Sequence, residues 1–166
     1  MKLDYNKATK KEIQASWEFY EARNEKLEDI YAAERASWDE DRNNVVQLFT
    51  TSDMMRIVNE VQTANLSFRS RVMERITSTL RLYSKENNKL KIALGDRREF
   101  YAIGNGVKYS DTQTKDLLNR DLSSVQRNVE IIETHVEYLR EIIKWSDQIG
   151  YAIKNKIEVH RLKYNE

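Results

Sequence analysis

The feature that most constrains this chain is an uninterrupted 4-3 repeat of apolar residues in its C-terminal third. The repeat consists of Leu118, Leu122, Val125, Val129, Ile132, Val136, Leu139 and Ile143. Alternating steps of four and three residues keep these side chains on one face of an α-helix and are typical of helices that associate with other helices. The same frame continues through Ser146, Gly150, Ile153, Ile157, His160 and Tyr164. The spacing predicts one long helix over residues 112–164, with Ser110 or Asp111 as its N-cap.

The rest of the chain contains few residues that interrupt a helix, because it has no proline and only four glycines. The capping box Thr9-Lys10-Lys11-Glu12 predicts the start of a first helix. This helix has its own 4-3 stripe, which contains Trp17, Tyr31 and Trp38 and lapses at Asn24 and Glu34. We expect it to end within residues 39–44.

A second long helix is predicted after Thr50, Thr51 and Ser52, whose hydroxyl groups are candidate caps. Its apolar stripe runs from Val58 to Leu94 and lapses at Asn65 and Asn87, and we expect a kink at residues 85–88 or at Gly95. Gly104-Asn105-Gly106 is the clearest loop, because Asn-Gly favours positive φ.

The expected fold class is therefore all-α, with long helices in an antiparallel hairpin or coiled-coil arrangement. The C-terminal heptad helix is expected to drive homo-oligomerisation, and an alternative is that its seam packs on the chain's own first two helices. The residues assigned to oligomerisation are Leu118, Leu122, Val125, Val129, Ile132, Val136, Leu139, Ile143, Ile153 and Ile157.

Several functional classes have no support in the sequence. There is no cysteine, no segment as long and apolar as a membrane span, and no apolar core in the N-terminal residues that would indicate a secretory signal. No nucleotide-binding or hydrolase motif is present, and the two histidines, His135 and His160, lack a metal-site context. We expect a non-enzymatic, cytoplasmic protein without a cofactor or metal, in the host cytoplasm if it is viral.

The charge is distributed unevenly, although the net charge is only +1. Residues 1–65 carry nine basic and thirteen acidic side chains, residues 66–109 carry ten and four, and residues 110–166 carry nine and ten. This pattern suggests an acidic N-terminal helix (1–50) that contacts protein partners, a basic region (51–109), and the heptad helix (110–166). A polyanion is expected to bind the basic region.

The basic region combines cations with aromatic side chains next to a loop, as single-stranded nucleic acid requires. Its candidate binding residues are Arg81, Lys85, Lys89, Lys91, Arg97, Arg98, Phe100, Tyr101 and Lys108. Phosphates would contact the cations, and bases would stack on the two rings. In the alternative interpretation the cations form a solvated helix face, and Phe100 and Tyr101 close the core at a helix end.

Two stretches, RLYSKENNKLKIALGDRREFYAIGNG and YLREIIKWSDQIGYAIKNKIEVHRL, resemble the UvsY-type recombination mediator proteins of T4-like bacteriophages. The similarity covers roughly residues 68–166. It consists of a basic helix, an aromatic pair, a glycine loop, a long heptad helix and the stretch Gly150-Tyr151-Ala152-Ile153-Lys154. The chain departs from the family pattern at Gly95, where a lysine is expected two residues before Arg97, and in its longer, acidic N-terminal part.

The resemblance implies a protein that binds single-stranded DNA coated by a single-strand-binding protein and helps to load a RecA-like recombinase. It also implies a ring-shaped homo-oligomer, hexameric or heptameric, in which Arg97 and Arg98 grip the strand. A structural coiled-coil or adaptor protein without nucleic-acid binding is the alternative, since the heptads alone fit it equally well. A helical sequence-specific regulator fits less well, because no helix-turn-helix is recognisable.

Overall fold

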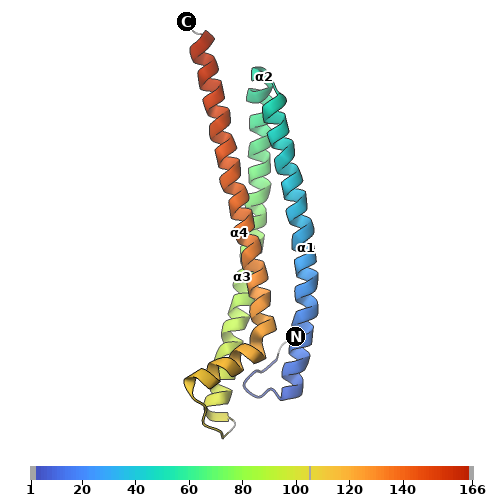
Figure 1. Ribbon diagram of the computed structural model, residues 1–166, viewed down its shortest axis with the longest axis vertical. Helices are drawn as coiled ribbons and strands as arrows, with labels where there is room; N and C mark the ends of the chain where they lie inside the picture. The colour runs from blue at the N-terminus through green and yellow to red at the C-terminus, as the bar shows by residue number, and fades with distance from the viewer. Residues whose placement is uncertain (1–2, 105, 165–166) are drawn as a thin grey trace. The chain divides into compact units, whose positions relative to one another are not determined.

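A computed structural model describes residues 3–104 and 106–164, and these residues form an all-α fold (Figure 1). Of the described residues 91% are helical and none is in a strand. The elements are α1 (Lys10–Thr51), α2 (Met54–Arg56), the π-helical segment η1 (Ile57–Val61), α3 (Gln62–Glu99), the π-helical segment η2 (Phe100–Gly104) and α4 (Asp111–Tyr164). The all-α prediction is confirmed. Within these described ranges, every helix is too short or too polar to cross a membrane.

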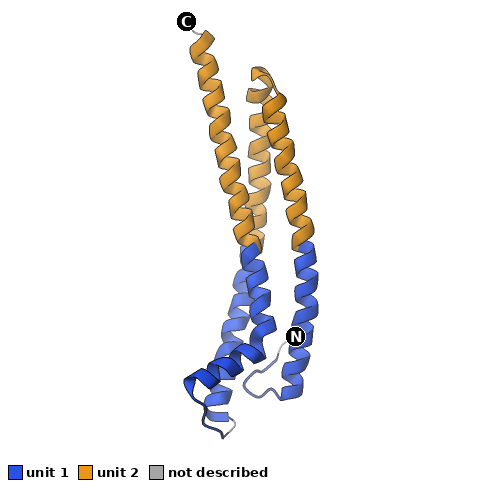
Figure 2. Cartoon of the chain, viewed as in Figure 1, with its two compact units in different colours: residues 1–30, 80–134 blue, residues 31–79, 135–166 orange. Residues whose placement is uncertain are grey.

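The chain divides into two compact units (Figure 2). Unit 1 comprises Met1–Ile30 and Leu80–Thr134, and unit 2 comprises Tyr31–Thr79 and His135–Glu166. Each unit contains one segment of α1, one of α3 and one of α4, and the α3 segment runs opposite to the other two (Figure 2). The units therefore cut across the predicted division into N-terminal, middle and C-terminal regions.

The first and the last of the three predicted helix starts have capping hydrogen bonds. The Thr9 N–H donates to Glu12 Oε2 at 2.8 Å, and the Glu12 N–H donates to Thr9 Oγ1 at 3.3 Å. Ser110 forms the same reciprocal pair with Gln113, since each backbone N–H donates to the side-chain oxygen of the other, at 3.0 and 3.2 Å. The capping boxes satisfy backbone N–H groups that have no partner within the helix. The prediction of Ser110 as N-cap of α4 is confirmed.

The predicted end of the first helix within residues 39–44 is wrong, because α1 continues to Thr51. Val45 is buried and extends the apolar face past the polar run, so that the helix remains anchored to the core. The predicted hydroxyl caps are also wrong, since Thr50 and Thr51 donate back to carbonyl groups of α1. The cap of α2 is Asp53, whose carboxylate accepts the Arg56 N–H at 2.9 Å.

The helix α3 passes without a break through residues 85–88 and through Gly95, against expectation. Glu86 is buried within the polar stretch and forms ion pairs with Arg23 and Lys89, so these polar residues join α3 to the core. Gly95 lies on an exposed side of α3, where a missing side chain weakens a helix without ending it. Of the predicted loop, Gly106 has a positive φ of 70° that favours glycine, and Asn105 lies outside the described residues.

The heptad seam of α4 forms the interior of the single chain. Leu122 and Val125 pack with Ile13, Tyr20 and Ala93 in unit 1. Eight of the ten residues assigned to oligomerisation are buried in this way, and the remaining two, Ile143 and Ile157, are half-buried. The seam thus contacts the chain's own helices, and its residues are unavailable to a second copy. The assignment of these ten residues to an oligomer interface is corrected accordingly.

In unit 2 the core contains Ile57, Val61 and Ile153. A second part of that core is aromatic, since the Phe68 ring packs edge-on against Trp38 and Trp145 at centroid separations of 5.9 and 5.8 Å. Four of these six residues, Trp38, Val61, Phe68 and Ile153, belong to the seam or stripes predicted from the sequence.

Two polar lapses of the predicted stripes, Asn24 and Asn65, are buried and form hydrogen bonds with α4. In unit 1 the Asn128 side-chain amide donates to Asn24 Oδ1 at 2.8 Å, and the Asn24 amide donates to the Ser124 carbonyl at 2.9 Å. In unit 2 Asn65 donates to the Ser146 carbonyl at 3.0 Å and accepts the Ser146 hydroxyl at 2.9 Å. Buried polar pairs of this kind fix which residues lie opposite each other.

Replacing Asn24 by alanine should lower the free energy of unfolding by about 1–3 kcal/mol, because the buried Asn128 amide loses its acceptor. Urea unfolding followed by circular dichroism measures this loss. In the pair Asn24→Ala/Asn128→Ala the two losses should not add, since the second substitution removes the unsatisfied donor. Strictly additive losses would show that the two amides do not interact.

Candidate nucleic-acid interface

The predicted nucleic-acid-binding region lies in unit 1, where the end of α3, η2 and the start of α4 meet residues 3–9. Its central residue is Arg97, which is only 4% exposed. The guanidinium donates to Asp121 Oδ2 at 2.8 Å and to the carbonyl groups of Tyr5 and Ala8 at 3.4 and 3.2 Å. Arg97 therefore joins α3 to α4 and to the N-terminal segment, and its charge is already neutralised by a carboxylate.

Tyr101 belongs to the same buried cluster. Its hydroxyl donates to Asp121 Oδ2, and burial followed by this hydrogen bond raises the pKa of Tyr101 above the usual value of a phenol. Neither Arg97 nor Tyr101 presents its polar group to a ligand. Their assignment as direct binding residues is corrected: the structure gives them the role of holding η2 against α4.

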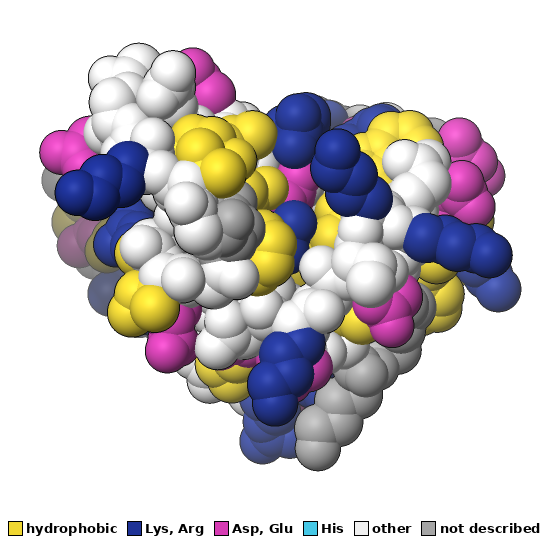
Figure 3. Space-filling model, turned by 90° about the horizontal axis from the view of Figure 1, so that it is seen from below, with side chains coloured by type: hydrophobic (Ala, Val, Ile, Leu, Met, Phe, Trp, Pro, Cys, Tyr) yellow, Lys and Arg dark blue, Asp and Glu magenta, His cyan; other side chains and the backbone are white. Residues whose placement is uncertain are grey.

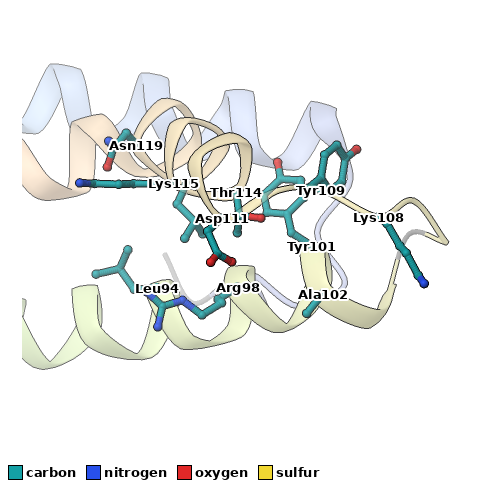
Figure 4. A pocket seen from close by; sticks show the side chains of 11 residues that line it. Leu94, Arg98, Tyr101, Ala102, Lys108, Tyr109, Asp111, Thr114, Lys115 and Asn119 are labelled. Carbon is teal, nitrogen blue, oxygen red and sulfur yellow. The ribbon is translucent and has the colours of Figure 1, made fainter.

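A pocket of about 780 Å³ opens beside this cluster. Leu94 and Arg98 reach it from α3, Tyr101 and Ala102 from η2, and Lys108 and Tyr109 from the segment before α4 (Figure 4). The α4 residues in its wall are Asp111, Thr114, Lys115, Leu118 and Asn119. Three cations and one carboxylate thus line a space whose inner wall is apolar and aromatic.

The aromatic part of the wall is built by edge-to-face contacts. The Tyr101 and Tyr109 rings lie 5.6 Å apart at 89°, and Phe100 packs edge-on against Tyr101 at 5.2 Å. Arg97 lies 4.2 Å from the Phe100 ring centroid, which holds that half-buried ring in place. These contacts hold the Tyr101 and Tyr109 rings in the pocket wall, whereas Phe100 does not line this pocket.

The ten cations of residues 66–109 differ in how far they are already compensated. Five form ion pairs with carboxylates: Arg69 with Asp147, Arg71 with Asp41, Arg75 with Glu34, Lys89 with Glu86 and Arg97 with Asp121. These pairs compensate half of the ten cations of this segment. The other five are exposed and make no ion pair with any described residue: Arg81, Lys85, Lys91, Arg98 and Lys108.

The exposed cations fall into two groups by their position on α3. Lys91 and Arg98 are seven residues apart, so they lie on one side of the helix, two turns from each other. Arg81 and Lys85 are four residues apart and lie on a different side. Arg98 and Lys108 line the pocket, whereas Arg81, Lys85, Lys89 and Lys91 do not. The pocket therefore unites only part of the predicted set.

Lys115 and Tyr109 are pocket residues that the sequence analysis did not select. Lys115 lies in the second turn of α4, after the Ser110 cap, and lines the pocket on the side away from Lys108 (Figure 4). The predicted N-cap was the signal that could have placed Lys115 there. Seen end-on, unit 1 shows Lys and Arg side chains spread around this face, with hydrophobic and acidic side chains between them (Figure 3).

Comparison with protein-family models, with curated proteins and with solved structures finds no match to this chain. The resemblance to UvsY-type mediators stays a prediction from the sequence motifs. Residue groups arranged to hold a metal ion are absent from the described part of the chain.

Proposed function

We propose that the chain binds single-stranded DNA at the pocket of unit 1 and acts as a recombination mediator. The observation that supports binding is that Arg98, Lys108 and Lys115 line one pocket together with the aromatic rings of Tyr101 and Tyr109. Cations attract the phosphates, and ring faces accept unstacked bases, so this combination favours a single strand over a duplex.

The mediator role rests on the sequence resemblance. In that role the protein weakens the hold of a single-strand-binding protein on DNA and helps a RecA-like recombinase to assemble in its place. Binding to the DNA backbone through a few cations suits such a handover, because the affinity is moderate and independent of base sequence.

A homo-oligomer, as the resemblance implies, needs a surface other than the buried seam. We assign this contact to the last turns of α4, where Tyr151, Val159 and Leu162 are 69%, 51% and 68% exposed. Several copies would present several pockets to one strand and so raise the affinity through effective concentration.

Alanine substitution of the three pocket cations, Arg98, Lys108 and Lys115, should weaken binding to a fluorescent oligothymidine roughly 10- to 100-fold at low salt. The slope of log affinity against log salt should become shallower by about 2, because three phosphate contacts are lost. Fluorescence anisotropy across a salt titration measures both quantities.

The matched control removes three charges elsewhere, at Lys11, Lys26 and Arg140, which are exposed and make no ion pair with any described residue. If the control weakens binding as much as the pocket variant, affinity follows net charge and not this pocket. No binding by the wild-type protein at micromolar concentration and low salt would overturn the proposal in favour of a structural or adaptor role. The mediator step is tested by the ATPase activity of a RecA-like recombinase on coated single-stranded DNA, which the wild type should stimulate and the pocket variant should not.

A further inference from the structure

A second groove of about 780 Å³ lies in unit 1 and shares Tyr101 and Tyr109 with the first pocket. Its lining adds the N-terminal segment, α1 and further residues of α3, η2 and α4. Lys7 belongs to the N-terminal segment, Lys10 and Trp17 belong to α1, and Arg120 belongs to α4. The two grooves are therefore neighbours on either side of one aromatic wall.

The second groove is electropositive. Its lining holds four cations, Lys7, Lys10, Arg97 and Arg120, and one carboxylate, Asp121. That carboxylate is already shared by the Arg97 guanidinium, the Tyr101 hydroxyl and the Arg120 guanidinium. Lys7 and Lys10 are exposed and form no ion pair with the described residues. An anion entering the groove meets cations whose charge is not compensated.

The groove also offers ring faces. Trp17 belongs to the apolar stripe of α1, whose side chains are expected to be buried. Its side chain is nevertheless 38% exposed and lines the groove. Phe100 and Tyr109 are half-buried in the same lining. Aromatic faces between uncompensated cations are the combination that binds single-stranded nucleic acid without sequence preference.

We propose that the second groove extends the nucleic-acid path, so that one strand passes over Tyr109 from the first pocket and a base stacks on Trp17. In this arrangement Lys7, Lys10 and Arg120 contact the phosphates of the following nucleotides. The inference rests on the proposed function of the first pocket and adds the N-terminal segment and the start of α1 to the binding surface. It assigns DNA binding to a region whose net acidity pointed to protein partners.

Trp17 provides a direct reporter, because the other two tryptophans, Trp38 and Trp145, lie in unit 2. In the variant Trp38→Phe/Trp145→Phe, all tryptophan fluorescence comes from Trp17. Titration with oligothymidine should quench this emission and saturate at the concentration at which anisotropy saturates. Binding without any change in Trp17 emission would overturn the inference.

Affinity measurements on the otherwise unchanged chain test the same groove independently. Trp17→Ala should weaken oligothymidine binding roughly 5- to 100-fold, the range for loss of one base stack. Lys7→Ala/Lys10→Ala should also weaken binding and make the salt slope shallower by about 1.4. The matched control is Lys11→Ala/Lys26→Ala, which removes two exposed lysines outside the groove, and it should bind as the wild type does.

The outcomes separate this inference from the proposed function. If the wild type does not bind, both are wrong. If the wild type binds and the pocket variant at Arg98, Lys108 and Lys115 does not, while Trp17→Ala and Lys7→Ala/Lys10→Ala bind normally, only the second groove is wrong. Equal losses in the Lys7/Lys10 variant and in its Lys11/Lys26 control would also overturn it.

Discussion

Replacing Arg97 by methionine should lower the free energy of unfolding by about 3–5 kcal/mol, the usual cost of leaving one partner of a buried ion pair alone. The Asp121 carboxylate would stay in the interior without its main cation, and the Tyr5 and Ala8 carbonyl groups would lose their donor. Urea unfolding followed by far-ultraviolet circular dichroism measures the change. The N-terminal segment should also become more accessible to proteases, because Arg97 is the residue that holds it to α3.

The matched control is the same substitution at the neighbouring Arg98, which is exposed and unpaired within the described residues. Arg98→Met should change the stability by less than about 0.5 kcal/mol while weakening DNA binding. The double variant Arg97→Met/Asp121→Leu should regain much of the lost stability, since it removes both buried charges. If Arg97→Met is as stable as Arg98→Met, the buried ion pair does not exist as described.

Replacing Leu139 by alanine should cost about 2–5 kcal/mol, because the side chain is fully buried and its removal leaves a cavity. Leu162→Ala on the same helix is the matched control. Leu162 is mostly exposed, so its truncation should change stability by less than about 0.5 kcal/mol. Denaturant unfolding of the two variants compares the same chemical change at two positions of one helix.

Light scattering of Leu139→Ala and of a third variant, Leu162→Asp, shows which part of α4 joins separate copies of the chain. Leu139→Ala should retain the wild-type mass under conditions in which it is folded, since the seam contacts the same chain. Leu162→Asp should lower the mass if the last turns of α4 form the proposed oligomer contact. A folded Leu139→Ala protein that dissociates would show that the seam also joins separate copies.

Local signals in the sequence predicted the helices well, because helix starts and apolar periodicity depend on residues within a few positions of each other. The capping boxes at Thr9 and Ser110 and the whole extent of α4 follow from such signals. The end of α1 was misplaced for the same reason. The polar residues 39–44 resemble a helix end when only neighbouring positions are considered. Val45 continues the buried face of α1, because another helix packs over it.

The candidate site was predicted only in part, because residues far away in the sequence determine whether a cation is buried in an ion pair or exposed to solvent. Arg97 and Arg98 are adjacent and look equivalent, yet the partner of Arg97 is Asp121, 24 positions further on. The alternative that Phe100 and Tyr101 close the core at a helix end is correct for Tyr101, which is buried, whereas Phe100 is only half-buried. The lapses at Asn24 and Asn65 were visible in the sequence, but their pairing with Asn128 and Ser146 required the fold.

The continuity of the helices across the two compact units has a consequence for how the protein unfolds. The unit boundaries fall after Ile30, Thr79 and Thr134, each in the middle of a helix and none at a loop. Hydrogen bonding along a helix is cooperative, so fraying of a helix in one unit exposes the next turn in the other. We expect a single unfolding transition and a shared hydrogen-exchange rate for the slowest amides of both units. Neither unit can be excised at a linker, and the unit that carries the proposed DNA-binding pocket therefore depends on helices that continue into the other unit.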